Sequence, residues 1–558
     1  MSAARWRMSA ARWRDLRTDV VAGIPGAISS VPNGMAAAVL VGVNPVHGLY
    51  ASFAGPIAGG LAASTDRMVI TTTTAAALAA GSAVEHVDAD DRAGAVVLVT
   101  LLAGAAMIVA GRLRLGRYTR FVSHSVMLGF LTGVAVNILL GQLPQLAGAT
   151  AEGSTPLARA IHVLLHPGGI DPAALLVGLV AVALLAGLRL TRLRLWATLV
   201  AVVVPTVLAA LAGIGLALVS DAGEFPSGFP VPHLPGLGTF SPGLITGALA
   251  VAAIVLVQGA GVSETATNRD GRPSDLNRDF QAQGAGNVAS SLFAGLPVGG
   301  SLGQTALNMA SGARTRWAGI FSGGWMLVIL VALSGLVGRV AMPTLSAVLM
   351  VAAAGSLQVG QVRAVLRTGP ISRVALGTTF LATLFLSVPA AVGLGVALSL
   401  LLQLNQEASD LRVVQLVPLE DGTMRERPAP AVLVDHQVTV LHVYGSLFYA
   451  GARTLQARLP QPAGSAGAAV VLRLRGHATL GTTVIAVLSR YAEQLAAVEG
   501  RLYLSGVDPE LTLLLSDPRN LSGPVQVFAA SEILGESTRA AVQDAQVWTQ
   551  ERTAPGHS

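Results

Sequence analysis

The sequence predicts an α-helical polytopic membrane protein with a small α/β domain at its C-terminal end. Of its 558 residues, 52% are hydrophobic and 12% are charged, and the mean hydropathy is +0.63. Soluble domains carry about 25% charged residues. From Val20 to Gln406 the apolar residues form long runs, and runs of about 20 residues are long enough to cross a bilayer. After about Ala408, predicted strands alternate with predicted helices, which is typical of an α/β domain.

Residues 1–19 read MSAARWRMSAARWRDLRTD, in which one heptad is written twice. A signal peptide ends in a small-residue cleavage site, and this segment has none that is convincing. We therefore expect a basic cytoplasmic N-terminal arm that lies beside anionic membrane lipid.

Fourteen apolar segments follow within residues 20–408, the predicted transmembrane transport domain. They lie near 20–42, 46–63, 68–84, 93–111, 122–140, 172–188, 196–218, 242–262, 280–296, 301–311, 317–338, 342–360, 372–387 and 389–405. The loop Ser220–Ser241, rich in Pro and Gly, divides them into two sets of seven.

The charges in the loops orient these segments. With the N-terminus inside, most loop arginines lie inside, among them Arg112 and Arg114, and most acidic residues lie outside, among them Asp88 and Asp90. Cytoplasmic loops of membrane proteins carry an excess of Lys and Arg. The pattern predicts fourteen crossings of the cell (inner) membrane, with both termini in the cytoplasm.

Residues 409–558 form the predicted cytoplasmic domain. Strands are expected at 431–443, where two surround a short turn, and at 469–475 and 501–505; helices are expected at 482–498 and from 509 to 515. No group of residues there resembles a nucleophile with its base and acid, so we expect a regulatory or structural role.

Several functional classes are excluded by composition. The chain has no cysteine and no lysine, so it has no disulfide, no thiolate metal site, no Walker A lysine and no Schiff base. Its arginines lie in separate loops rather than on one basic face, which argues against a nucleic-acid partner. Residues 299–303 match the G-x-S-x-G nucleophile elbow, but they lie among membrane segments and no His follows in that region. We expect that the protein is not an enzyme and that it binds neither a cofactor nor a metal ion.

The candidate binding site lies in the third segment of each half. Each has a polar stretch that leads into a short helix, and the residues are Thr72, Thr73 and Thr74 in one half and Ser301, Leu302, Gly303 and Gln304 in the other. The free N–H groups and the positive dipole end of a helix start attract anions. If both helices start near the midplane, their starts converge on one anion site. The alternative is that the Thr run and the glycines serve only helix packing.

A few other polar residues lie within the predicted segments. Asn33 lies between Pro32 and Gly34, where a break in the helix would point its side-chain amide toward the interior. Gln258 also places a side-chain amide within a predicted segment. Each amide either belongs to the binding site or makes a hydrogen bond between helices. Glu264 is the proton-coupling candidate, with a solvated helix end as the alternative. For His47 and His124 we expect structural roles.

Two stretches resemble the signatures of the SulP (sulfate permease) family, the bacterial relatives of solute carrier family 26. They are VPNGMAAAVLVGVNPVHGLYASFAGP at 31–56 and LNRDFQAQGAGNVASSLFAGLPVGGSLGQTALNMASGARTRWAG at 276–319. The C-terminal domain resembles the STAS domain of these carriers. The resemblance covers the whole chain beyond the arm.

The resemblance implies a seven-plus-seven inverted repeat with a core domain at 20–112 and 242–338 and a gate domain at 113–241 and 339–408. It further implies a substrate held between the starts of segments 3 and 10, movement of core against gate, and a homodimer. Family members carry small inorganic or organic anions. The acidic residue that many members have in segment 8 falls on Gln258 here, which argues against sodium, since hard cations favour carboxylates.

The leading hypothesis is a secondary active transporter of small anions, most like the proton-coupled dicarboxylate (fumarate-type) members, in which the proton is a co-substrate. The alternatives are sodium-coupled uptake of bicarbonate or sulfate and, from another class, a membrane sensor that signals through the STAS domain.

Overall fold

The computed structural model describes residues 2–117, 123–153, 155–223, 228–236, 238–266, 268, 270–386, 388–409, 411–419, 423–447, 449–517 and 519–553. The chain divides into two compact units, Met1–Ser399 and Leu400–Ser558, which are described separately.

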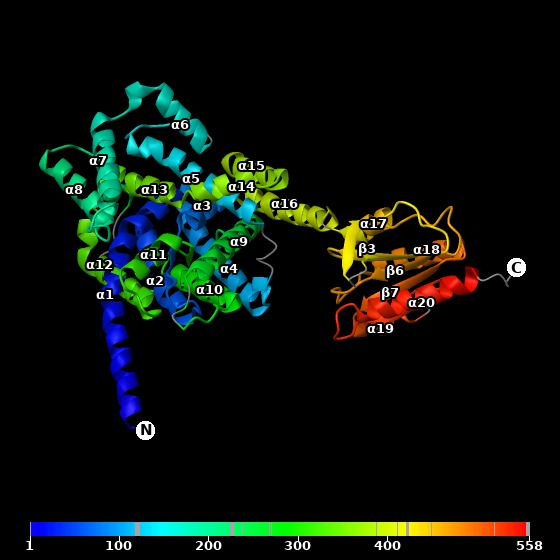
Figure 1. Cartoon of the computed structure of the whole chain (residues 1–558). Coiled ribbons are helices and arrows are strands. Elements are labelled where there is room, and N and C mark those ends of the chain that lie inside the picture. The colour runs from blue at the N-terminus through cyan, green and yellow to red at the C-terminus, as the bar shows by residue number, and fades with distance from the viewer. Residues whose placement is uncertain are drawn as a thin grey trace. The chain divides into compact units, whose positions relative to one another are not determined.

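The first unit is helical (Figure 1). Its helices are α1 Ser2–Val41, α2 Val46–Ala62, α3 Thr74–Ala83, α4 Ala89–Arg112, α5 His124–Leu146, α6 Pro156–Leu165, α7 Pro172–Arg189, α8 Ala197–Leu211, α9 Pro242–Thr265, α10 Leu276–Leu292, α11 Leu302–Ala310, α12 Trp317–Val337, α13 Met342–Ser356, α14 Val359–Arg367, α15 Pro370–Phe385 and α16 Val388–Ser409. Each predicted segment overlaps one of these helices, while α6 and α14 lie in or beside the loops that the sequence predicts.

Length and apolar composition alone identify six described stretches able to cross a membrane. They are Trp13–Val41, Ala89–Arg112, His124–Leu146, Pro172–Arg189, Pro242–Thr265 and Met342–Arg367. Other apolar helices, such as α3, are shorter. The helical transmembrane fold is confirmed, and the count of fourteen crossings stays a prediction.

Helix α1 differs from the expectation in two ways. It begins at Ser2, so the predicted arm is helical and continuous with the first segment, and its first turns project from the bundle (Figure 1). It also runs unbroken through Pro25 and Pro32, so the helix break expected at Asn33 does not occur. Asp19, fully buried, accepts a hydrogen bond from Arg314 N at 2.7 Å, which ties α1 to the loop after α11.

One large core joins the two halves of this unit. Most of its buried members come from α1–α5, α9, α10, α12 and α13, including Met35, Leu98, Val255 and Met326. Helices from the two halves alternate in space: α10 packs against both α2 and α4, and α1 packs against α12. Segments far apart in the sequence therefore meet at the centre of the bundle.

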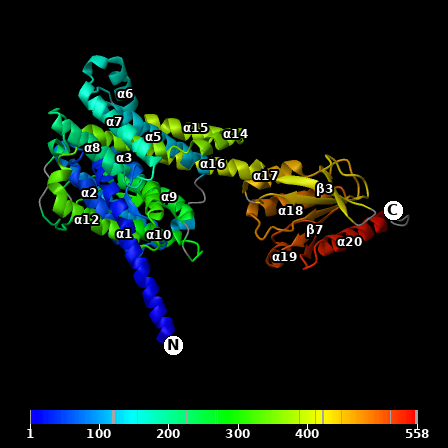
Figure 2. The same cartoon turned by 60° about the vertical axis from the view of Figure 1, so that its left-hand side comes forward.

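The second unit is an α/β domain with one six-stranded sheet (Figure 2). Its strands are β3 Arg412–Pro418, β4 Met424–Pro428, β5 Val438–Tyr444, β6 Ala469–Arg473, β7 Arg501–Val507 and β8 Val525–Ala529, and its helices are α17 Tyr449–Arg458, α18 Thr482–Ala496, α19 Pro509–Leu515 and α20 Glu536–Thr553. The order is β4-β3-β5-β6-β7-β8, antiparallel from β4 to β5 and parallel from β5 to β8.

The sheet has a separate core on each face. Leu455 of α17 and Leu488 of α18 belong to one core, and Ala541 and Ala545 of α20 belong to the other. The α/β class was predicted correctly, and the turn expected within 431–443 forms at His436, whose φ is +51°. Of the two strands expected around it only the second, β5, forms, while Val432 before the turn makes a single bridge with Gln461. Strands β3, β4 and β8 and helices α17 and α20 were not predicted.

Candidate functional site

The third segments of the two halves meet in a two-stranded antiparallel sheet. Strand β1 is Ile70–Thr72 and strand β2 is Val298–Gly300. Ile70 lies opposite Gly300, and Thr72 lies opposite Val298. Helix α3 follows β1 and helix α11 follows β2, so the two short helices leave opposite ends of the same small sheet.

Each short helix begins with a side-chain cap. Thr73 caps α3 by accepting from Ala76 N at 3.2 Å, and Ser301 caps α11 by accepting from Gln304 N at 3.3 Å. The caps occupy one donor each. The N–H groups of the first helical residues have no carbonyl partner within the helix and carry the positive end of the dipole. In the structure, the short helix expected after each polar stretch begins at Thr74 in one half and at Leu302 in the other.

The register of the small sheet sets the spacing of the two helix starts along the strands. The pairing register places Ser301 opposite Val69, so Thr73 and Ser301 are four strand positions apart. At 3.3 Å per strand residue this is about 13 Å. An anion bound by both starts must therefore bridge the length of the small sheet.

The start of α11 is open on one side and polar on the other. A Cβ built on Gly303 has no heavy atom within 4 Å, and Leu302 is 38% exposed. Gln304 is buried and donates from Nε2 to Ser29 Oγ at 3.3 Å, while its Oε1 has no partner. Asn33 donates from Nδ2 to the same Ser29 Oγ at 3.3 Å. Asn33 and Gln304 are thus brought together through a serine that sequence reasoning did not single out.

Gln258 lies beside β2 at the edge of a small apolar cavity. A Cβ built on Gly300 lies 3.2 Å from the Cα of Gly259, the next residue of α9. The cavity, of about 60 Å³, is lined by α9, α5 and the last two helices of the unit, including Phe130 and Thr379. Among the residues that the structure describes, the Oε1 of Gln258 is buried without a partner, and so is the Oγ1 of Thr71, which was not among the candidates.

Glu264 is not brought to these residues. It is exposed in the last turn of α9, and six residues separate it from Gln258, about 9 Å along the helix. His47 has a structural contact, as expected: its Nδ1 lies 2.6 Å from Ala294 O in the loop before β2. His124 is the first residue of α5 and is exposed.

The buried carboxylate that the candidates missed is Asp279 of α10. It is 0% exposed and accepts five hydrogen bonds, from the N–H and hydroxyl groups of Ser64 and Thr65 and from the hydroxyl of Ser263. Ser64 and Thr65 lie in the loop before β1. The sequence signal was available, because Asp279, Gln283 and Asn287 are spaced by four residues.

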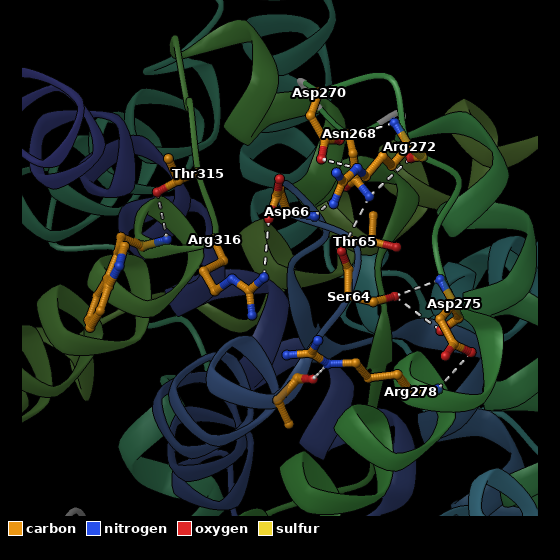
Figure 3. Close-up of polar contacts among 12 residues, drawn as sticks. Ser64, Thr65, Asp66, Asn268, Asp270, Arg272, Asp275, Arg278, Thr315 and Arg316 are labelled. Atoms are coloured by element: carbon orange, nitrogen blue, oxygen red, sulfur yellow. Dashed lines mark hydrogen bonds and ion pairs between the residues drawn. The ribbon is translucent and has the colours of Figure 1, made fainter. Parts of the chain in front are cut away.

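Further polar contacts hold the same loop (Figure 3). Arg316 Nη2 lies 3.3 Å from Asp66 Oδ1, and Ser64 Oγ donates to Asp275 O at 3.0 Å. Arg278 Nε donates to Ala62 O at 3.0 Å. Hydrogen bonds and an ion pair therefore hold the segment before β1 against the start of α10 and against the loop after α11.

Comparisons with known proteins agree with this architecture. A model of the Sulfate permease family matches residues 16–379, and a STAS domain model matches residues 429–517. A probable sulfate transporter of Mycobacterium tuberculosis is 28% identical over 417 residues, covering 73% of this chain and 74% of that protein. Sulfate transporter 4.1, chloroplastic, of Arabidopsis thaliana is 24% identical over 464 residues, covering 80% of this chain and 67% of that protein.

Two solved structures show the fold. Murine Solute Carrier 26 family member A9, an anion transporter in the inward-facing state, aligns with a TM-score of 0.79 at 18% identity, covering 96% of this chain and 91% of that chain. The transmembrane domain of the cyanobacterial bicarbonate transporter BicA aligns with a TM-score of 0.61 at 20% identity, covering 68% of this chain and 98% of that chain.

Proposed function

The chain belongs to the sulfate permease family, and we propose that it is a secondary active transporter that carries a small dicarboxylate together with protons. It is a multi-pass membrane transporter, not an enzyme. Its substrate site is formed by the starts of α3 and α11, at Thr72–Thr74 and Ser301–Gln304, with Asn33 and Gln258 nearby.

The observation that carries this proposal is the pairing register of β1 with β2, which separates the two helix starts. Thr73 and Ser301 are about 13 Å apart along the strands. With a hydrogen bond of about 2.9 Å at each end, an anion bonded to both starts has acceptor atoms about 7 Å apart. A four-carbon dicarboxylate has an anionic group at each end and approaches this length, whereas sulfate and bicarbonate are shorter.

Proton coupling follows from the neutral character of the site. Gln258 offers an amide where a sodium site favours a carboxylate, and the donors at the helix starts are backbone N–H groups. A dianion that brings its own proton loses one charge and is cheaper to move into a low-dielectric site. Glu264, the proton-coupling candidate of the protein, lies away from the site and is the competing carrier.

The remaining parts of the proposal concern movement and assembly. The core, residues 20–112 and 242–338, moves in an elevator-like way against the gate, residues 113–241 and 339–408, and the cavity at Gln258 lies where α9 of the core meets α5 of the gate. The protein acts as a homodimer in the cell membrane, with its N-terminus and STAS domain in the cytoplasm.

The test is an uptake panel in proteoliposomes. Succinate, fumarate, sulfate, bicarbonate and chloride are offered with a proton gradient and a sodium gradient imposed separately. We expect proton-driven accumulation of the dicarboxylates. Sodium-driven uptake of bicarbonate or sulfate supports the alternative that the family relatives suggest. Binding without flux of any solute supports the sensor hypothesis.

A further inference from the structure

Helix α10 presents a row of buried polar side chains to the small sheet. Asp279, Gln283 and Asn287 follow at intervals of four residues, with Ser290 in the next turn, and each is 0% exposed. Residues spaced this way lie on one face of a helix. Burying polar groups is unfavourable unless they are hydrogen-bonded, so the partners of this row decide what it does.

Strand β2 has polar groups that β1 does not reach. In an antiparallel pair, facing residues alternate between those that exchange hydrogen bonds and those that do not. Ser301 N donates to Val69 O at 3.0 Å. By alternation, Val298 and Gly300 turn their N–H and C=O groups away from β1.

Two side chains of the row meet these groups. Asn287 Oδ1 accepts from Val298 N at 2.9 Å, and its Nδ2 donates to Val298 O at 2.7 Å. Gln283 Oε1 accepts from Gly300 N at 3.1 Å. These are the contacts that a neighbouring strand makes, so the side chains stand where a third strand of the sheet would lie.

The ends of the row fasten the segments that lead into the sheet. Asp279 holds the loop before β1 through Ser64 and Thr65. Ser290 Oγ donates to Leu296 O at 2.6 Å, just before β2. One helix face therefore fixes the approach to both strands and the free edge of β2.

Glycines of α9 and α4 lie beside both residues. A Cβ built on Gly259 of α9 lies 2.3 Å from the amide atoms of Gln283, and one built on Gly104 of α4 lies 2.9 Å from Asn287 Cβ. Glycine at these two positions lets α9 and α4 close on α10 next to the two amides.

We propose that Gln283 and Asn287 are positioning residues of the transport site. They fix β2 and thereby set the direction of the first N–H groups of α11, without touching the substrate. The structural part of this inference is independent of the proposed function, and its consequence for affinity rests on that function.

The experiment compares Asn287→Ala with Ser291→Ala in the full-length protein. Ser291 is a matched control because it is equally buried on α10 but donates only to Val288 O of its own helix, at 2.8 Å. Hydrogen–deuterium exchange is measured for residues 298–304 and for the rest of α10, and the KM and kcat of succinate uptake are measured in proteoliposomes.

We expect Asn287→Ala to speed exchange at 298–304 by about tenfold or more, with the remaining helices unchanged, and to raise KM more than it lowers kcat. Ser291→Ala leaves both unchanged. If Asn287→Ala does not fold, Gln283→Met is used instead. It keeps the size of the side chain and removes the acceptor for Gly300 N, and we expect the same faster exchange at 298–304.

Exchange at 298–304 that matches the control overturns the inference. Faster exchange with an unchanged KM supports the positioning of β2 by Asn287 but contradicts the proposed location of the transport site. The experiment therefore distinguishes a wrong inference about β2 from a wrong proposal about the site.

Discussion

At the scale of single residues, Gly303 gives the sharpest test of the site. The space around it is open, so a large side chain fits there without disturbing the fold. Gly303→Trp covers the first N–H groups of α11, and we expect it to abolish uptake of the transported anion while the melting temperature stays within a few degrees. Uptake is measured in proteoliposomes and melting in detergent.

Gly324→Trp is the matched control. Gly324 lies within α12, and a Cβ built on it also has no heavy atom within 4 Å. We expect this variant to transport normally. Normal transport by Gly303→Trp would show that the start of α11 does not bind the substrate.

A substitution at Glu264 distinguishes two routes for the coupled proton, which is carried either by the substrate or by this side chain. It is exposed at the end of α9, so a role in coupling requires the proton to pass through solvent. If the substrate carries the proton, Glu264→Gln keeps the rise in uptake rate as external pH falls toward the second pKa of the dicarboxylate. The rate is measured as a function of external pH at a fixed substrate concentration. A flattened pH profile identifies Glu264 as the carrier instead.

The sequence predicted that a polar stretch leads into a short helix in the third segment of each half, because a change from polar to apolar residues is a local signal. It did not reveal Asp279, whose partners Ser64 and Thr65 are more than 200 residues earlier. Such partners become visible only when the halves are packed together. Gln304 was predicted as a site residue, but its link to Asn33 through Ser29 depends on the relative rotation of α1 and α11.

At the scale of elements, Asp279 joins α10 to the loop before β1. Asp279→Ala removes the acceptor of the N–H groups of Ser64 and Thr65 and of the Thr65 hydroxyl, whereas the hydroxyls of Ser64 and Ser263 keep Asp275 O and Gly259 O as acceptors. Each unsatisfied buried group costs about 1–3 kcal/mol. We expect the free energy of unfolding to fall by about 3 kcal/mol or more. Thermal melting of the detergent-solubilised protein measures the loss, and Asp275→Ala, at the exposed cap of α10, is the milder comparison. Equal melting temperatures for the two variants would contradict the role of Asp279.

In the α/β unit, His442 of β5 makes stability depend on pH. Burial, together with the charge of Arg473, lowers the pKa of His442 below its usual value of 6.5, so the folded state holds the ring neutral. The unfolded chain then binds more protons than the folded domain below pH 6.5, and stability falls as pH drops through this range. We expect the urea midpoint of residues 411–553 to decrease from about pH 7.5 to about pH 5.5.

His442→Gln removes the titrating group and should flatten this dependence. A midpoint that falls equally in the variant would assign the pH effect to other groups.

Elements were predicted where their length made the signal strong. A run of apolar residues long enough for a membrane helix is unmistakable, and most segment bounds agree with the helices to within a few residues. Strands β1 and β2 have three residues each, too few to show the period of a strand, so their pairing could not be read from the sequence. In the α/β unit, residues 431–434 have strand-like composition but form only a single bridge, at Val432, because tertiary contacts override a weak β-propensity.

At the scale of the whole molecule, the two units have separate cores. The large core of the first unit contains no residue beyond Leu357, and the cores of the second begin at Leu411. Truncation after Arg412 should therefore leave a folded membrane domain that elutes as a single species in detergent, although its uptake rate is lower if the STAS domain assists gating. Failure of the truncated chain to insert, with an unfolded isolated STAS domain, would contradict the boundary near residue 409.

The family and the coarse architecture were predictable from the whole sequence, since one signature stretch, 31–56, lies in the first half of the membrane region and the other, 276–319, lies in the second half. The spacing of the two helix starts was not predictable. It depends on the register of β1 with β2, which brings residues 70 and 300 opposite each other. That register separates the two helix starts by about 13 Å along the strands, and this spacing is the physical basis for the proposal of a dicarboxylate.

The measurement that tests this claim most directly uses the absence of cysteine from the chain. Gly303→Cys introduces a single thiol at the open start of α11, and its reaction rate with a membrane-impermeant thiol reagent is followed in proteoliposomes with and without succinate, sulfate or bicarbonate. Gly369→Cys, at the exposed N-terminal cap of α15, is the control for general effects of the solutes. The account predicts that succinate slows labelling at position 303, that sulfate and bicarbonate slow it less, and that labelling at 369 does not change. Labelling at 303 that succinate leaves unchanged, in a variant that still transports succinate, would contradict the account.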